Sequence, residues 1–148
     1  ARLEEAEAAP REGLVLMRSL RERVGDMPEV VRSLSVSLDS VGRVAQAQGR
    51  LEEAEAAYRE SLELRRSQRE RLGDTPEVVR DLSVSLKWLG DVLLAQEKFD
   101  EALEHYEEAR RLRQRLALAL PHIPEHRQAM DEVYQAIEDL RRSRSRPS

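Results

Sequence analysis

The chain repeats itself with a fixed period of 48 residues. Residues 2–49 and 50–97 are identical at 33 of the 48 aligned pairs, and RLEEAEAA at 2–9 recurs at 50–57. A third, more diverged copy begins at Lys98, and its Pro124 falls where Pro76 of the second copy predicts. A period of this size is typical of stacked supersecondary units, each of which buries its apolar face only against its neighbours. We therefore expect a fold built by repetition, whose function depends on its surface rather than on catalytic chemistry.

Composition favours helices over sheets. The chain is 36% charged, 40% hydrophobic and only 3% aromatic, which is the profile of long amphipathic helices, so we expect an all-α protein. No apolar run reaches the ~18 residues of a membrane span, and the N-terminus is charged from Arg2, which argues against a signal peptide. These features predict a cytoplasmic protein, and the net charge of −4 argues against nucleic acid as the partner. Because the chain begins in mid-repeat, we expect it to be a segment of something longer.

Proline and glycine divide each repeat into two helices. Gly73 can end one helix in a left-handed conformation, while Thr75 can cap the next with Pro76 in its first turn. We call the helix that follows the proline helix A and the one that follows the shorter turn helix B. The pattern predicts a half repeat at 2–24, repeats at 28–72 and 76–120, and a final helix at 124–143, within one domain over 1–143. That makes six helices in the order B, A, B, A, B, A.

The second and third copies then carry a family signature, made by Leu86, Leu89, Gly90, Leu93, Phe99, Ala102, Tyr106 and Ala109. The same pattern occurs one period earlier, across the first and second copies, in Leu38, Val41, Gly42, Ala45, Leu51, Ala54 and Tyr58. This spacing resembles the tetratricopeptide repeat (TPR) family, and the resemblance covers nearly the whole chain. It implies a right-handed α-solenoid in which two helix backbones approach at Gly90 and Ala102 beside the ring of Tyr106. The usual unit is about 34 residues, so this chain looks like a long-repeat, bacterial-type array.

The two ends of the chain depart from the pattern. Pro10 stands at the position of Tyr58, and an internal proline removes a hydrogen bond, so we expect the first helix to kink or restart there. Glu138 and Arg141 replace the apolar or small residues of earlier copies, which predicts that the last helix is a cap. Residues 144–148 are basic and of low complexity, and we expect them to form a disordered tail. Weak binding of RNA or of an acidic partner is the less favoured interpretation of that tail.

The resemblance also implies that the A helices line a concave groove that accepts a peptide. The candidate groove residues are Asp39, Arg43, Gln46, Lys87, Trp88, Asp91, Leu94, Glu132, Gln135 and Asp139. TPR domains that hold the acidic C-terminal tail of chaperones use Lys and Asn at such places, because a terminal carboxylate needs charged donors. Asp39 and Glu132 stand where lysines are wanted, so this reading is disfavoured.

Two interpretations of the groove charges stay open. Asp39 beside Lys87, and Arg43 beside Asp91, can neutralise one another as a structural ladder. Alternatively, a bound peptide makes use of the same charges. In that case Trp88 is the expected hot spot, since tryptophan is enriched at the centres of binding sites and its repeat equivalents are small.

Catalytic and metal-binding patterns are absent from the sequence. There is no cysteine, and His122 and His126 straddle Pro124, so they do not share a helical face as two metal ligands would. The serines of the LSVSL stretches have no histidine or lysine partner in the sequence, and no glycine-rich phosphate loop occurs. We expect no enzyme activity, no metal and no cofactor.

The sequence therefore predicts a protein–protein interaction scaffold with an unidentified protein or peptide partner. The alternative is a rigid spacer or self-association element of a larger protein. The first helix carries Val15, Met17 and Leu20 at positions occupied by polar or charged residues in the second copy. Either upstream repeats cover this extra apolar face, or two chains pair through it as a homodimer with a two-fold axis.

Overall fold

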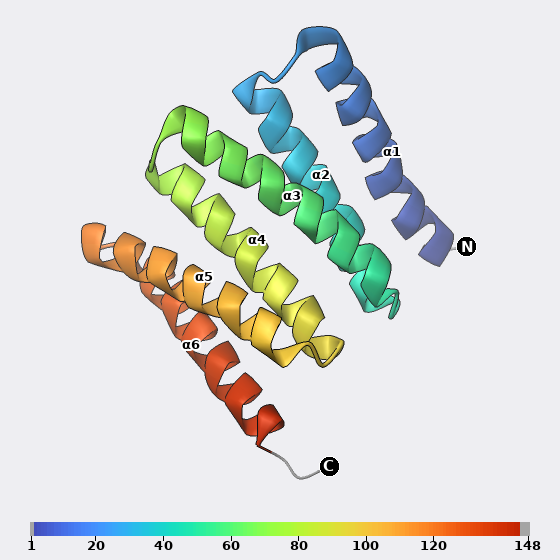
Figure 1. Ribbon diagram of the computed structural model, residues 1–148. Coiled ribbons are helices and arrows are strands. Elements are labelled where there is room, and N and C mark those ends of the chain that lie inside the picture. The colour runs from blue at the N-terminus through green and yellow to red at the C-terminus, as the bar shows by residue number, and fades with distance from the viewer. Residues whose placement is uncertain (1, 146–148) are drawn as a thin grey trace. The chain divides into compact units, whose positions relative to one another are not determined.

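The computed structural model describes the backbone of residues 2–145 and the side chains of residues 9–145, and this part of the chain is all-α (Figure 1). Its six helices are α1 (Arg2–Val24), α2 (Pro28–Ala47), α3 (Leu51–Leu72), α4 (Pro76–Ala95), α5 (Phe99–Ala119) and α6 (Pro124–Arg144). The expected fold class and number of helices are confirmed. None of the described helices is long and apolar enough to cross a membrane.

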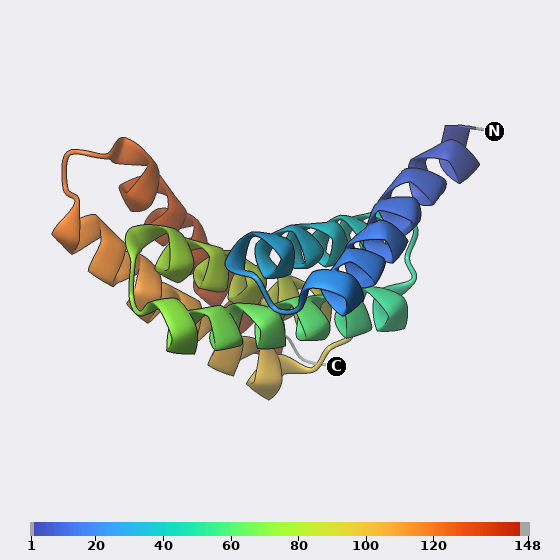
Figure 2. The same cartoon turned by 90° about the horizontal axis from the view of Figure 1, so that it is seen from above.

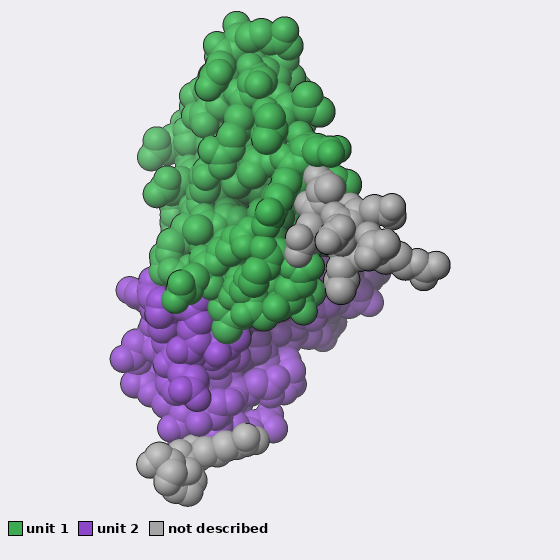
Figure 3. All heavy atoms as spheres, turned by 90° about the vertical axis from the view of Figure 1, so that its right-hand side faces the viewer, with its two compact units in different colours: residues 1–73 green, residues 74–148 purple. Residues whose placement is uncertain are grey.

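Contacts divide the chain into two compact units, coloured green and purple in Figure 3. Unit 1 is Ala1–Gly73 and unit 2 is Asp74–Ser148. The division falls in the turn between α3 and α4. Each unit therefore contains one complete A–B hairpin and one further helix, which is α1 in unit 1 and α6 in unit 2.

In unit 1, α2 packs against both α1 and α3. Its core is made by Val31, Leu34 and Leu38 of α2 with Leu64 of α3, and Leu14 and Met17 of α1 pack against this cluster. The spacing of three and four residues along α2 places these side chains on one helical face. Figure 2 shows the reversal of the chain between α1 and α2 from above.

In unit 2, α5 packs against both α4 and α6. Leu82, Leu86 and Leu89 of α4 are fully buried, as are Val133 and Leu140 of α6. Glu138 and Arg141 of α6 are exposed, and Nη2 of Arg141 lies 3.8 Å from Oε1 of Glu107 on α5. One-sided burial fits a capping helix, and that role of α6 stays a prediction. The helix extends to Arg144, whose Nη2 lies 2.6 Å from Oδ1 of Asp100, while residues 146–148 of the predicted tail lie outside the described part.

The tight turn inside each hairpin has the same hydrogen bonds in both units. In unit 1, Gly49 N–H donates to Gln46 and Arg50 N–H to Ala45; in unit 2, Glu97 and Lys98 make the corresponding bonds to Leu94 and Leu93. This is the Schellman arrangement, which needs a left-handed residue after the helix. Gly49 adopts it at φ +75°, and Glu97 adopts it at φ +61° despite its side chain.

The turns that lead into A helices follow the predicted punctuation. Gly73 has a φ of +79°, and the hydroxyl of Thr75 accepts a hydrogen bond of 3.2 Å from the N–H of Val78 at the start of α4. At the start of α2, Met27 occupies the capping position and offers no side-chain acceptor. We expected a kink or a restart at Pro10. This residue lies inside the continuous helix α1, so the restart is wrong, while the kink stays a prediction. A proline removes one hydrogen bond without ending a helix whose later turns pack against a neighbour.

Each hairpin is held at its crossing by a glycine and a tyrosine. A Cβ added to Gly42 would lie 2.6 Å from Cε1 of Tyr58, and one added to Gly90 would lie 2.6 Å from Cε1 of Tyr106. Both tyrosine side chains are fully buried. The ring thus fills the space that any other residue would need, and the predicted role of these glycines is confirmed.

Candidate functional site

The candidate groove residues of α2 differ in exposure. Asp39 is buried, with 2% of its surface exposed, and its Oδ2 lies 2.6 Å from Nη2 of Arg65 on α3. Gln46 accepts a hydrogen bond of 3.0 Å from the hydroxyl of Tyr58, whereas Arg43 is exposed. Asp39 therefore belongs to the interior of the α2–α3 hairpin, and of these three side chains Arg43 is the most accessible.

On α4, all four candidate residues are half-buried. Lys87 Nζ lies 3.0 Å from Oδ2 of Asp91, one turn further along the same helix. Asp91 also accepts a hydrogen bond from the hydroxyl of Tyr106. Burial and the charge of Asp91 raise the pKa of this tyrosine, so it stays a donor. Trp88 and Leu94 are the two apolar residues among the four candidates on α4.

The candidate residues of α6 are all exposed. Gln135 Nε2 donates a hydrogen bond of 2.9 Å to Oδ1 of Asp139, while Glu132 acts on the guanidinium of Arg113. The candidate residues of unit 2 are therefore charged and polar side chains on α6 together with Trp88 and its three neighbours in the candidate set on α4.

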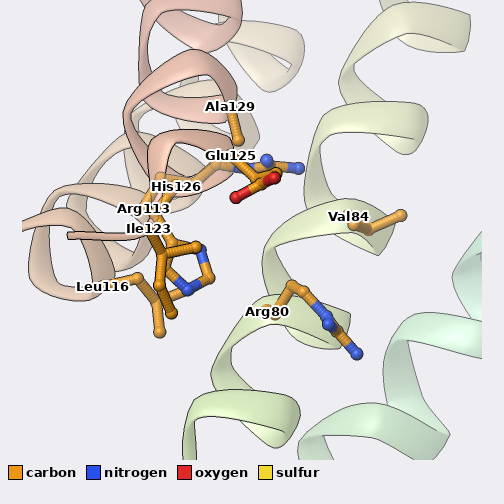
Figure 4. A pocket seen from close by; sticks show the side chains of 8 residues that line it. All are labelled: Arg80, Val84, Arg113, Leu116, Ile123, Glu125, His126 and Ala129. Carbon is orange, nitrogen blue, oxygen red and sulfur yellow. The ribbon is translucent and has the colours of Figure 1, made fainter. Parts of the chain in front are cut away.

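A pocket of about 420 Å³ lies between the three helices of unit 2 (Figure 4). It is lined by Arg80 and Val84 of α4, Arg113 and Leu116 of α5, Ile123 in the turn before α6, and Glu125, His126 and Ala129 of α6. In Figure 4 the α4 side chains lie across the pocket from those of α6. The site thus combines apolar walls with two arginines and one carboxylate.

Sequence reasoning missed Arg65 and Arg113, the two buried arginines at equivalent positions of the second and third copies. The described part of α5 shows the signal that could have found them. Ala102, Tyr106, Ala109, Arg113 and Leu116 follow one another at spacings of four and three residues, and all are buried. Arg113 is therefore a charged residue on the core stripe of its helix, where an apolar residue is expected.

The face of α1 that was proposed for self-association is only partly accessible. Val15 is 63% exposed and the neighbouring Leu16 is 65% exposed, but Met17 packs against the core of unit 1 and Leu20 is half-buried. A second pocket, of about 390 Å³, lies between α1 and α2 and includes Leu16, Met17 and Val36. Within the described residues, no group of three or more potential metal ligands comes together.

Comparison with known proteins identifies the repeats. Residues 34–67 and residues 84–116 each match a family model described as tetratricopeptide repeat. Each match includes one glycine–tyrosine crossing and parts of both helices around it. These two segments are tetratricopeptide repeats. Repeats of this TPR family generally mediate protein–protein interactions.

A solved structure is similar to this chain in fold. The crystal structure of BtubC (BKLC) from P. vanneervenii aligns with a TM-score of 0.55 over 95% of this chain, at 18% sequence identity. The alignment spans 57% of that chain's length. At this identity the likeness concerns the fold alone. No curated protein matches the chain.

Proposed function

We propose that this chain is a protein-binding module that holds a peptide segment of its partner against the A helices. In unit 2 the candidate contact residues are Lys87, Trp88, Asp91 and Leu94 of α4 and Glu132, Gln135 and Asp139 of α6. In unit 1 the accessible candidates are Arg43 and Gln46 of α2. The two tetratricopeptide repeats support an interaction role, and the side chains of α4 suggest where it takes place.

The observation that carries this proposal is Trp88. It is half-buried on α4, and the equivalent positions hold the small residues Ser40 and Ala136. The repeat therefore folds without a large side chain at this place. Trp88 also follows Arg80 and Val84 at steps of four residues, so it continues the helical stripe that lines the pocket of unit 2. A half-buried tryptophan whose repeat equivalents are small, on the helical stripe that leads to a pocket, fits a binding hot spot.

Selection of peptides tests the proposal directly. A random peptide library displayed on phage is selected against the 148-residue chain, and the selected peptides are titrated while the fluorescence of the single tryptophan is followed. We expect saturable binding that changes the Trp88 emission. Trp88→Ala should weaken binding by about 2 kcal/mol or more, while far-ultraviolet circular dichroism stays unchanged. A failure to select any peptide, or equal affinity for the variant, would contradict the proposed role of this face.

Self-association is the second candidate function, and one observation favours it. Val15 and Leu16 of α1 are both more than half exposed, and Val36 of α2, which lines the adjacent pocket with Leu16, is 43% exposed. Large apolar side chains gathered in this way commonly mark an interface. Sedimentation equilibrium up to high micromolar concentration measures the mass, and Val15→Lys with Leu16→Lys should dissociate any dimer formed through α1. Met17 is not suitable for this test because it packs in the core.

A further inference from the structure

Arg113 of α5 is a buried cation that forms no ion pair with a carboxylate among the described residues. Only 8% of its surface is exposed, and its Nε has no hydrogen-bond partner among the described residues. Burial lowers the pKa of Arg113, and the charge of Glu132 acts in the opposite direction. Buried charges in proteins are normally paired, because an isolated ion in the interior is costly. The environment of Arg113 is therefore incomplete, and this residue lines the pocket of unit 2.

The other repeat shows what completes such an environment. Arg65 precedes Arg113 by one period of 48 residues, and it is equally buried, with 7% of its surface exposed. Its guanidinium lies 2.6 Å from the carboxylate of Asp39 on the paired A helix. The residue equivalent to Asp39 in the next repeat is Lys87, which pairs with Asp91 of its own helix instead. The second hairpin therefore has the equivalent arginine but no carboxylate at the position of Asp39.

The surroundings of Arg113 suit an acidic ligand with an apolar stem. Arg80 adds a second guanidinium to the lining; its side chain is 51% exposed, and its Nε lies 3.8 Å from Oδ1 of Asp81. Glu125 is the one carboxylate that lines the pocket, against two arginines. Val84, Leu116 and Ala129 provide walls against which methylene groups can pack. A planar carboxylate matches the fork of donors on an arginine.

We propose that this pocket binds the carboxylate of a glutamate side chain from a partner protein, which takes the place that Asp39 has beside Arg65. The proposal rests on the proposed function and gives the partner's chemistry: an acidic residue between apolar ones. Glutamate is favoured over aspartate because Arg113 is buried at the pocket, and the longer side chain reaches further while packing its methylene groups on Val84 and Leu116.

Nuclear magnetic resonance of the arginine side chains tests this proposal on the full 148-residue chain. The probes are the capped tripeptides Ac-Leu-Glu-Leu-NH₂ and Ac-Leu-Gln-Leu-NH₂, titrated to millimolar concentration. We expect the glutamate peptide to shift the Nε–Hε signal of Arg113 and to bind about tenfold more tightly than the glutamine peptide, because only the former offers a charged acceptor. The signal of Arg65, whose carboxylate partner is internal, should not move and serves as the control.

Two variants test whether the preference for glutamate depends on Arg113. Arg113→Met introduces the residue that the first copy already carries at this position, Met17, and it should abolish the preference for glutamate over glutamine. Lys87→Asp with Asp91→Arg introduces the residues that the first hairpin has at these two positions, Asp39 and Arg43, so that Arg113 acquires an internal carboxylate and the glutamate peptide is excluded. Circular dichroism establishes that both variants are folded.

The outcomes separate this inference from the function on which it rests. Equal binding of the two tripeptides, or no shift at Arg113, would overturn the carboxylate site even if phage selection yields peptides that depend on Trp88. The carboxylate site would also be overturned if the selected peptides bound the Arg113→Met variant through Trp88 as tightly as they bind the unmodified chain. Failure of phage selection alongside a glutamate-specific shift at Arg113 would instead count against the peptide groove and leave the pocket standing.

Discussion

Gly90 lies against the ring of Tyr106 so closely that a Cβ on the glycine would stand 2.6 Å from Cε1 of the tyrosine. The ring is fully buried and has no room to withdraw. Gly90→Ala should therefore destabilise the protein by about 1–3 kcal/mol through overpacking, in spite of the better helix propensity of alanine.

Thermal and urea unfolding measure this cost, and Gly13→Ala provides the control. A Cβ on Gly13 meets only Ser37 Oγ at 3.7 Å, which is an ordinary contact, so this variant should gain about 0.5–1 kcal/mol from helix propensity. If both variants change stability in the same direction, the crossing at Gly90 does not restrict the hairpin as described.

The two buried arginines should respond oppositely to the same substitution. Arg65→Met leaves the carboxylate of Asp39 buried without its guanidinium, and breaking a buried pair in this way costs about 3–5 kcal/mol. Arg113→Met removes a buried charge that makes no ion pair with a carboxylate among the described residues and feels Glu132 only at longer range, so the free energy of unfolding should stay the same or rise. Urea denaturation of the two variants gives the comparison. A loss of several kcal/mol in Arg113→Met would mean that its charge is well compensated within the chain.

A missing cap at the start of α2 should be repairable. Met27 is 49% exposed and offers no acceptor, whereas Thr75 accepts a hydrogen bond from Val78 at the same place in the next repeat. Met27→Thr should stabilise the protein by about 1 kcal/mol, the usual contribution of an N-cap hydroxyl. The melting temperature reports the gain, and Thr75→Met should show a loss of similar size. If Met27→Thr brings no gain, the missing side-chain acceptor does not limit the stability of α2.

The hairpin turn of unit 2 carries a side chain where unit 1 has none. Glu97 has a φ of +61°, in the region that Gly49 occupies at +75°. A left-handed conformation costs a residue with a Cβ about 1–2 kcal/mol, so Glu97→Gly should raise the free energy of unfolding by up to about 1 kcal/mol once the greater freedom of the unfolded glycine is included. The reverse substitution, Gly49→Glu, should lower it. Chemical denaturation measures the free energy of unfolding of both variants, and a loss in Glu97→Gly would contradict the prediction.

Local features of the fold could be predicted from the sequence because they depend on residues near one another in the chain. Gly73, Thr75 and Pro76 mark the end of α3 and the start of α4 through backbone chemistry alone. The resemblance to the family also predicted one tertiary contact, between Gly90 and Tyr106. By contrast, Asp39 and Arg65 are 26 positions apart and both charged, and each was compatible with an exposed helix face. Their burial follows from the pairing of α2 with α3, which no local pattern encodes.

The candidate site was predictable to a smaller extent for the same reason. Trp88 stood out because it is the single tryptophan and its equivalents are small. Arg113 did not, since arginines are abundant in this chain and most are solvated. The left-handed conformation of Glu97 was also invisible, because the residue type gives no sign of it and only the equivalence with Gly49 suggests it.

The buried charge of Arg113 connects the stability of unit 2 to its occupancy. An ion held in the interior without its counter-ion makes the empty state less stable than a neutral side chain would. A ligand that supplies the counter-ion binds the folded chain and not the unfolded one, so it raises the melting temperature as its concentration rises. In unit 1 the same cost is met permanently by Asp39. The two hairpins thus differ at one position, which is Asp39 in unit 1 and Lys87 in unit 2. The first hairpin supplies its own counter-ion, whereas the second reaches its full stability only when a ligand supplies one.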